Sequence, residues 1–213
     1  MSDLMKVGSD WGGQGTFKPF TSGISGAQRV LDAHGRYFDS AFAGRIYSLS
    51  ATAAAPTAYV GAAGGTPLIA AHNPANSGKV LVCYIVGFAQ RAIATAAGQT
   101  GLALWSGPSV VPTGTKTSPT NAYTLAASGA SALGFVNAAL TGSTALALAL
   151  PLYTHYWATA AAAWSASAMF DIGGIVMAAP GNQIALGLTV VPTSVTVDVS
   201  LFWEEVPALL ISP

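Results

Sequence analysis

The chain has 213 residues, a length that fits one all-β domain with an appended segment. Charged residues make up only 8% of it and its formal net charge is zero, whereas about 25% of residues are charged in ordinary soluble domains. A neutral chain has no electrostatic basis for binding nucleic acid or an anionic membrane, so neither is expected as a partner. Because a solitary soluble protein keeps its surface charged, we expect a chain so poor in charge to assemble with other copies of itself.

No segment reads as a membrane span, and no signal peptide is expected. A spanning helix needs about 20 consecutive apolar residues, and the best candidate, residues 144–170, is interrupted by Pro151, His155 and several Ser and Thr residues. The N-terminus lacks a charged region followed by an apolar run. The single Cys83, flanked by apolar residues, excludes an intramolecular disulfide and is expected to be a buried small side chain.

Residues 1–45 differ from the rest of the chain and are predicted to form an irregular N-terminal arm. They carry nine of the sixteen charged residues and six aromatic residues, and their glycines break any regular period. Disordered tails are poor in aromatic residues, so an arm that becomes ordered against a partner fits this composition better. Aromatic side chains would anchor it, and arginines would donate paired hydrogen bonds. The candidate partner-binding residues are Trp11, Phe17, Phe20, Arg29, Arg36, Tyr37, Phe38 and Arg45.

From Ile46 onward the pattern is that of β-strands, and residues 46–213 are predicted to form one β-sandwich domain. Runs rich in β-branched and aromatic residues predict strands at 46–52, 57–60, 67–70 and 102–105. The turn formers of residues 73–79 lead into residues 80–89, which are almost continuously apolar. Such a run predicts a central strand that is buried on both faces.

Residues 107–145 are the loosest part of the predicted domain. Proline and glycine recur there amid Thr, Ser and Ala, and connections of this length are usually functional loops or disordered. We expect them to lie at one end of the sandwich, exposed to partners. Further along, residues 158–163 are helix-prone because of their alanine content.

The C-terminal part shows the clearest alternation. From Val195 to Trp203 the odd positions are apolar, and the even positions up to Ser200 are polar. A period of two places successive side chains on opposite faces of a strand, so one face belongs to the core and the other to water. Strands are predicted at 145–150, 152–158, 175–177, 183–190 and 193–203, with turns at 180–182 and 191–194. The last three strands are expected to pair in order as a β-meander, and the whole domain to contain eight or nine strands.

No motif for catalysis or for cofactor binding is present in the sequence. His34, His72 and His155 are far apart and have no carboxylate or cysteine at ligand spacing, so each is expected to be a hydrogen-bonded loop residue. We therefore expect no metal, no cofactor and no enzyme activity.

Two other groups of residues receive a structural interpretation. The only close carboxylate pair is Glu204-Glu205, and because neighbours on a strand point to opposite faces, the two are expected to end the last strand and keep its tip solvated. Four tryptophans of the body are expected in the core or at an interface rather than as carbohydrate platforms: Trp105, Trp157, Trp164 and Trp203.

Four stretches, in their order along the chain, resemble a known class of protein. They are Gly35-Arg36-Tyr37-Phe38, the run from Gly44 to Ser48, the turn from Asn73 to Lys79, and the closing run from Val199 to Glu205. Together with the Gly- and aromatic-rich start, this order is similar to that of small structural proteins of tailed bacteriophages, among them the capsid decoration (cement) proteins.

This resemblance implies a jelly-roll-like antiparallel β-sandwich with an irregular N-terminal arm, assembled as a homotrimer on the capsid surface of a virion. The arm would reach the major capsid protein, so that the trimer clamps neighbouring capsid subunits. The chain departs from many cement proteins in having an arm of 45 residues. A head-fibre or tail-tip (baseplate) protein that binds a receptor or glycan through loops 107–145 is therefore the alternative, and a hydrolase with a site of unrecognised type is a third.

Overall fold

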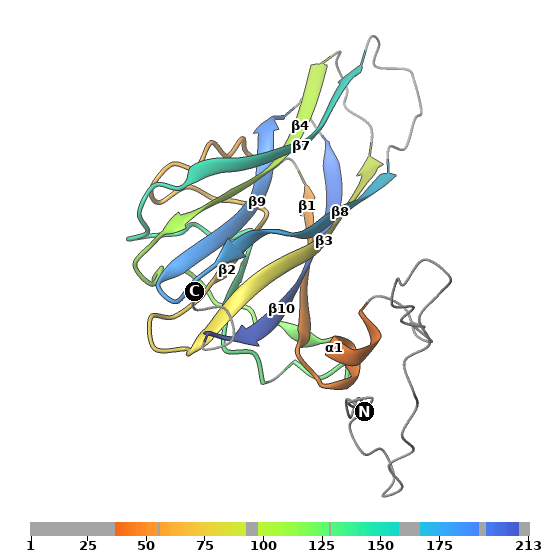
Figure 1. Cartoon of the computed structure of the whole chain (residues 1–213). Coiled ribbons are helices and arrows are strands. Elements are labelled where there is room, and N and C mark those ends of the chain that lie inside the picture. The colour runs from red at the N-terminus through yellow and green to blue at the C-terminus, as the bar shows by residue number, and fades with distance from the viewer. Residues whose placement is uncertain are drawn as a thin grey trace, which may run out of the picture. The chain divides into compact units, whose positions relative to one another are not determined.

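The computed structural model describes residues 37–54, 56–92, 98–127, 129–157, 167–191 and 195–208 of the chain. The predicted arm before Tyr37, the helix-prone segment 158–163 and most of the predicted turn at 191–194 lie outside these residues. In chain order the elements are α1 (Phe38–Phe42), β1 (Ile46–Ala54), β2 (Ile69–His72), β3 (Lys79–Ala92), β4 (Gly98–Pro108), β5 (Thr120–Asn121), β6 (Leu133–Val136), β7 (Ala147–Trp157), β8 (Ser167–Ala178), β9 (Asn182–Val190) and β10 (Thr196–Pro207) (Figure 1). The described part contains no helix long and apolar enough to cross a membrane.

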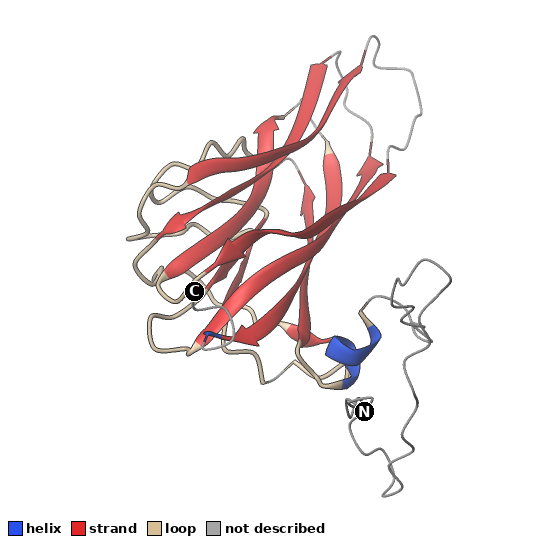
Figure 2. Ribbon diagram, in the orientation of Figure 1, coloured by secondary structure: helices blue, strands red, loops and turns tan. Residues whose placement is uncertain are grey.

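The strands form two five-stranded antiparallel sheets that pack as a sandwich (Figure 2). Sheet 1 has the order β5-β1-β10-β3-β8, and sheet 2 has the order β6-β2-β9-β4-β7. Apart from the short β5 and β6, successive strands alternate between the sheets, except that β4 and β7 pair with each other. This interleaving is that of a jelly roll, so the predicted jelly-roll-like antiparallel β-sandwich is confirmed.

The predicted C-terminal meander is wrong. β8 and β10 belong to sheet 1, whereas β9, which lies between them in the chain, belongs to sheet 2. The predicted turn at 180–182 is present, with the Asn182 N–H donating to the Ala179 carbonyl at 2.9 Å, but it passes the chain to the facing sheet. An alternating pattern indicates which side chains of a strand face the core, and it does not indicate which strand lies alongside.

The main core lies between the two sheets, and β10 contributes strongly to it. The odd positions from Val195 to Trp203 are buried, as their alternation predicts. They belong to one cluster with the even positions from Ile184 to Leu188 of β9 in the facing sheet. Trp203 stacks on Tyr47 of the neighbouring β1, with ring centroids 6.4 Å apart. Since each large apolar side chain that is fully buried contributes about 1.5–3 kcal/mol, this pattern accounts for much of the stability of the sandwich.

Residues 57–60 are not a strand, contrary to prediction. They form only one bridge to sheet 2, between Ala58 and Leu188. The Tyr59 side chain lies against Gly187 of β9, where an added Cβ would come within 2.8 Å of the Tyr59 Cβ. The packing of one aromatic side chain therefore positions this stretch, and the next strand begins two residues later than predicted, at Ile69.

β3 is central in sheet 1, between β10 and β8, but only one of its faces is fully buried. Leu81, Cys83 and Val86 face the core, whereas Tyr84 and Ile85 are half-buried. Cys83 is a free, buried cysteine as expected, and burial raises the pKa of its thiol to about 12. The prediction of burial on both faces is thus half right.

The two strands predicted at 145–150 and 152–158 are one strand, β7, which runs through Pro151. Proline has no N–H to donate to a sheet, so it is tolerated on an edge strand. β7 is the edge strand of sheet 2, beside β4. The proline therefore marks a sheet edge, and not the boundary between two strands.

Loops cover the outer face of sheet 2 with a second, smaller core. Tyr59, Leu140 and Leu146 from the loops pack there with Trp105 of β4 and Phe135 of β6. The Tyr59 and Trp105 rings meet edge to face, with centroids 5.0 Å apart. The region 107–145 therefore does not simply project from one end, as predicted; it contains β5 and β6, and part of it covers sheet 2.

Two polar side chains are buried side by side where β2 pairs with β9. His72 and Gln183 are register partners and are 1% and 0% exposed. Among the described residues, neither ring nitrogen of His72 and neither amide atom of Gln183 has a hydrogen-bond partner. The prediction of a hydrogen-bonded loop histidine is therefore wrong for His72, which ends a strand. His155 lies in β7, and His34 lies outside the described residues.

The buried His72 is expected to make stability depend on pH. Burial lowers the pKa of His72 below its ordinary value, and the Lys116 charge lowers it further. The unfolded chain then binds a proton at His72 more readily than the folded chain. The neutral His72 therefore costs the folded state no stability above about pH 6.5, and the free energy of unfolding decreases as the pH falls below that value. Urea unfolding at about pH 7.5 and about pH 5.5 should show a smaller acid-induced loss in His72→Gln than in the native chain. An equal loss in both would place the effect on other groups.

Candidate interaction surface

Three of the eight predicted partner-binding residues lie within the described part of the chain. Tyr37 is half-buried in a turn, Phe38 begins α1, and Arg45 lies between α1 and β1. Outside the described residues lie Trp11, Phe17, Phe20, Arg29 and Arg36. Binding of a partner by these eight residues stays a prediction.

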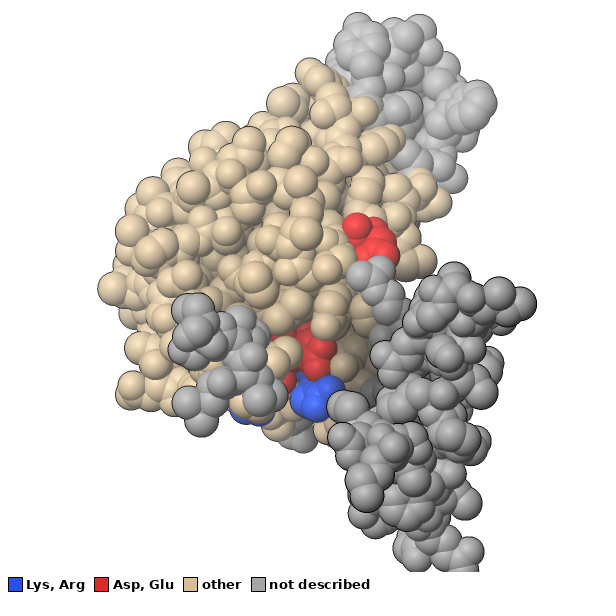
Figure 3. Space-filling view, viewed as in Figure 1, with Lys and Arg blue, Asp and Glu red and all other residues tan. Residues whose placement is uncertain are grey.

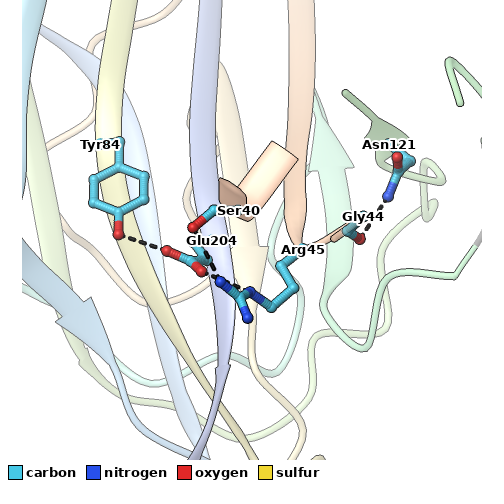
Figure 4. Close-up of polar contacts among 6 residues, drawn as sticks. All are labelled: Ser40, Gly44, Arg45, Tyr84, Asn121 and Glu204. Atoms are coloured by element: carbon cyan, nitrogen blue, oxygen red, sulfur yellow. Dashed lines mark hydrogen bonds and ion pairs between the residues drawn. The ribbon is translucent and has the colours of Figure 1, made fainter. Parts of the chain in front are cut away.

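Arg45 forms an ion pair at the start of the sandwich, as Figure 4 shows. Its Nε donates to Glu204 Oε1 at 2.9 Å, and its Nη2 donates to Ser40 Oγ at 3.2 Å. The Tyr84 hydroxyl donates to the other carboxylate oxygen, Glu204 Oε2, at 2.6 Å. The Glu204 side chain is only 6% exposed, and a carboxylate at such a position needs a charged or hydrogen-bonded partner. The Arg45 guanidinium is thus used partly within the chain, where it joins α1 to β10.

Asn121 in β5 holds the same junction through the backbone. Its Nδ2 donates to the Gly44 carbonyl at 2.7 Å, and its Oδ1 accepts from the N–H groups of Tyr123 and Thr124. Gly44 has a φ of 68°, the left-handed conformation in which helices such as α1 commonly end. Sequence reasoning missed this residue, because its partner Gly44 is 77 positions away in the chain.

Glu205 is buried, so the predicted solvation of this carboxylate is wrong, as it is for Glu204. Glu205 is 1% exposed and accepts the N–H of Ser131 at 2.8 Å and the N–H of Ala132 at 3.0 Å. Backbone donors satisfy the carboxylate in place of water. Nearby, the Tyr47 hydroxyl donates to the Gly129 carbonyl at 2.9 Å, and burial together with the Glu205 charge raises the pKa of Tyr47. The end of β10 therefore fixes the loop around residues 129–132.

The outer face of sheet 1 carries a broad, shallow groove with a volume of about 790 Å³. Its floor follows one register row across the sheet, in which Ser50, Ser200, Gly87 and Met169 lie side by side on β1, β10, β3 and β8. An added Cβ at Gly87 would come within 2.4 Å of Ser200 Oγ. The groove exists because the side chains in the middle of this row are small.

An ion pair lies at one end of the groove. Arg91 Nε donates to Asp198 Oδ2 at 2.9 Å, and the Thr52 hydroxyl donates to Asp198 Oδ1. Both side chains are partly exposed, so the pair contributes at most about 1 kcal/mol to stability. Its more important effect is that the two charges in the groove neutralise each other.

Exposed apolar side chains continue from the groove along the edge strand β8. Met169 is 75% exposed and Ile175 is 72% exposed, and Met177 is exposed to a lesser degree. In Figure 3 most of the visible face of the described body is uncharged, and the acidic and basic side chains are confined to its right-hand and lower parts. Exposed apolar surface that is contiguous and rimmed by polar residues commonly marks a site of protein–protein contact. The outer face of sheet 1, from the groove to Met177, is therefore the candidate interaction surface.

Comparisons with protein-family models, with curated proteins and with solved structures find no match to this chain. Within the described residues, no three His, Cys, Asp or Glu side chains are grouped as metal ligands would be. The arrangement of these residues offers a largely apolar face with few charges for association, and the buried carboxylates Glu204 and Glu205 accept hydrogen bonds from donors of the same chain.

Proposed function

We propose that the protein is a virion structural protein of a tailed bacteriophage, specifically a capsid decoration (cement) protein. In this proposal the jelly-roll body associates as a trimer on the capsid, and the N-terminal arm binds the major capsid protein. Support comes from the sequence resemblance and from a sandwich whose strand order is that of a jelly roll.

The observation that carries the proposal is how the body uses its few charges. The Arg45–Glu204 and Arg91–Asp198 pairs are internal, and Glu205 is satisfied by backbone N–H groups. Little charge is left on the surface to keep copies apart in solution, and interface cores are depleted in charged residues. Such a surface suits a protein that is permanently packed against other subunits.

The roles of the two parts follow from their chemistry. A body with an apolar face suits contact with other copies, and an arm with aromatic and arginine residues suits contact with a different protein. The junction of Arg45, Glu204 and Asn121 would give the arm a fixed point of departure, because three hydrogen bonds of 2.7–3.2 Å hold that stretch.

A shell-binding assay tests the proposal. Full-length protein is incubated with empty phage shells assembled without it, and the pelleted fraction is measured over a range of concentrations. Anchor residues cost about 1–2 kcal/mol or more when truncated, so the full-length triple variant Trp11→Ala, Phe17→Ala and Phe20→Ala should bind at least about 100-fold more weakly. Val60→Ala, which changes an exposed apolar residue outside the arm, is the control and should bind normally.

Other outcomes of the assay would favour the alternatives. Equal binding by the triple variant would contradict the assignment of the arm. The native protein could instead fail to bind shells and give a glycan-array signal that Tyr123→Ala abolishes. That result would favour a tail-tip or head-fibre protein that binds a glycan through loops 107–145.

A further inference from the structure

The two sheets of the sandwich differ in what covers them. The outer face of sheet 2 is packed under loop residues such as Tyr59, Leu140 and Leu146. The outer face of sheet 1 has no comparable cover within the described residues, and it leaves Met169 and Ile175 more than two-thirds exposed. A jelly roll with one covered face and one bare apolar face presents a single broad surface for docking.

This bare face contains both a hollow and projecting side chains. The hollow is the groove above Ser50, Gly87 and Ser200. The projections are Ile175 and Met177, which lie further along β8 and do not line the groove. When one molecule carries both complementary shapes at separate places, the projection of one copy can fit the hollow of the next. Head-to-tail contacts of this kind close into a ring when the rotation between copies closes, and otherwise they extend as a filament.

The charge of the face also favours an identical neutral partner. Its ion pair is internal, between Arg91 and Asp198, so burial against another neutral surface leaves neither of these two charges unpaired. The exposed Asp171 is the one further charge on β8, and its Oδ1 accepts the Gly173 N–H at 2.9 Å. A strongly acidic or basic partner would gain no attraction from such a face. The surface that matches it in apolar character and low charge is the same face of another copy.

The size of the face suits a stable contact. Strands lie about 4.8 Å apart and rise about 3.3 Å per residue, so the four long strands of sheet 1 present a face of about 20 Å by 30 Å, or about 600 Å². Each partner in a standard interface contributes roughly 800 Å² of accessible surface. Because projecting side chains make the accessible area larger than this flat estimate, one face of sheet 1 has close to the accessible area that each partner contributes to a specific interface.

We propose that copies of this chain associate through the outer face of sheet 1, with Ile175 and Met177 of one copy seated in the groove above Ser50, Gly87 and Ser200 of the next. This inference deepens the proposed function and rests on the self-assembly in it. This contact would bury the apolar side chains of β8 that are exposed to water in a single copy.

The first test compares two charge substitutions in the full chain by light scattering after size exclusion. Ile175→Asp places a charge on the projection, and Val110→Asp places one on an equally apolar, exposed loop residue outside the face. We expect Val110→Asp to keep the native mass and Ile175→Asp to elute as the 21.4 kDa single chain. Unchanged far-UV circular dichroism and thermal unfolding of Ile175→Asp would show that the loss is one of association and not of folding.

A cross-linking test locates the contact directly. Chains with Ile175→Cys are co-expressed with chains carrying Ser50→Cys and treated with a short bismaleimide. The only native cysteine, Cys83, is buried and has a thiol pKa of about 12, so it should not react. Covalent dimers should form from this pair and not from Val110→Cys with Ser50→Cys.

The outcomes separate this inference from the proposed function. If the native chain is an oligomer but Ile175→Asp keeps its mass and the cysteines do not cross-link, the surface is assigned wrongly while self-assembly stands. If the native chain is itself a single copy, self-assembly fails and the inference falls with it.

Discussion

Trp203→Ala should lower the free energy of unfolding by about 3–5 kcal/mol, because it removes a large side chain from a closely packed core. Trp203 is 1% exposed, belongs to the main cluster between the sheets and stacks on Tyr47. In a domain of this size the midpoint of thermal unfolding should fall by roughly 10 °C. Urea and thermal unfolding of the native and variant chains measure both quantities.

Two control substitutions separate core packing from position in the strand. Phe202→Ala changes the preceding residue, which is only partly buried on the opposite face of β10, and should cost about 1 kcal/mol. Trp203→Phe keeps an aromatic ring and removes an indole N–H that has no hydrogen-bond partner among the described residues, so its loss should be well below that of alanine. Equal losses for Phe202→Ala and Trp203→Ala would contradict the assignment of the two faces.

Glu205→Ala should lower the free energy of unfolding by about 2–4 kcal/mol, since hydrogen bonds to a charged group each contribute about 1.5–3 kcal/mol. The substitution leaves the N–H groups of Ser131 and Ala132 without their acceptor. Hydrogen exchange gives a specific readout, because those two amides should lose protection before the strands of the main core do.

Glu205→Gln provides the matched control for this prediction. Glutamine keeps the size of the side chain and one acceptor oxygen, so it should restore part of the lost stability and protection. If Glu205→Ala leaves the exchange of Ser131 and Ala132 unchanged, the carboxylate does not hold this loop.

The strongest patterns in the sequence predicted the strands but not their neighbours. Alternation from Val195 to Trp203 was sufficient to assign a half-buried strand, and the structure confirms its buried positions. The meander failed because β10 pairs with β1 and β3, which come more than 100 positions earlier in the chain, and not with β9. Pairing between distant strands depends on the whole fold, and a local period of two contains no information about it.

Polar residues were harder to interpret than apolar ones for a related reason. Glu204 and Glu205 suggested a solvated strand tip, yet Arg45 and the N–H groups near Ser131 come from distant parts of the chain to meet them. A carboxylate is tolerated inside a protein when donors surround it, and those donors become visible only in the folded structure. The same limit applies to the groove, whose small floor residues lie on separate strands.

The mass of the purified full-length protein in solution, by size exclusion with light scattering, tests the central claim most directly. If the chain is a structural protein that assembles through its neutral surface, the mass should be three times 21.4 kDa and should persist on dilution. A single chain at every concentration would contradict permanent self-assembly and would show that the low surface charge serves contact with a different partner.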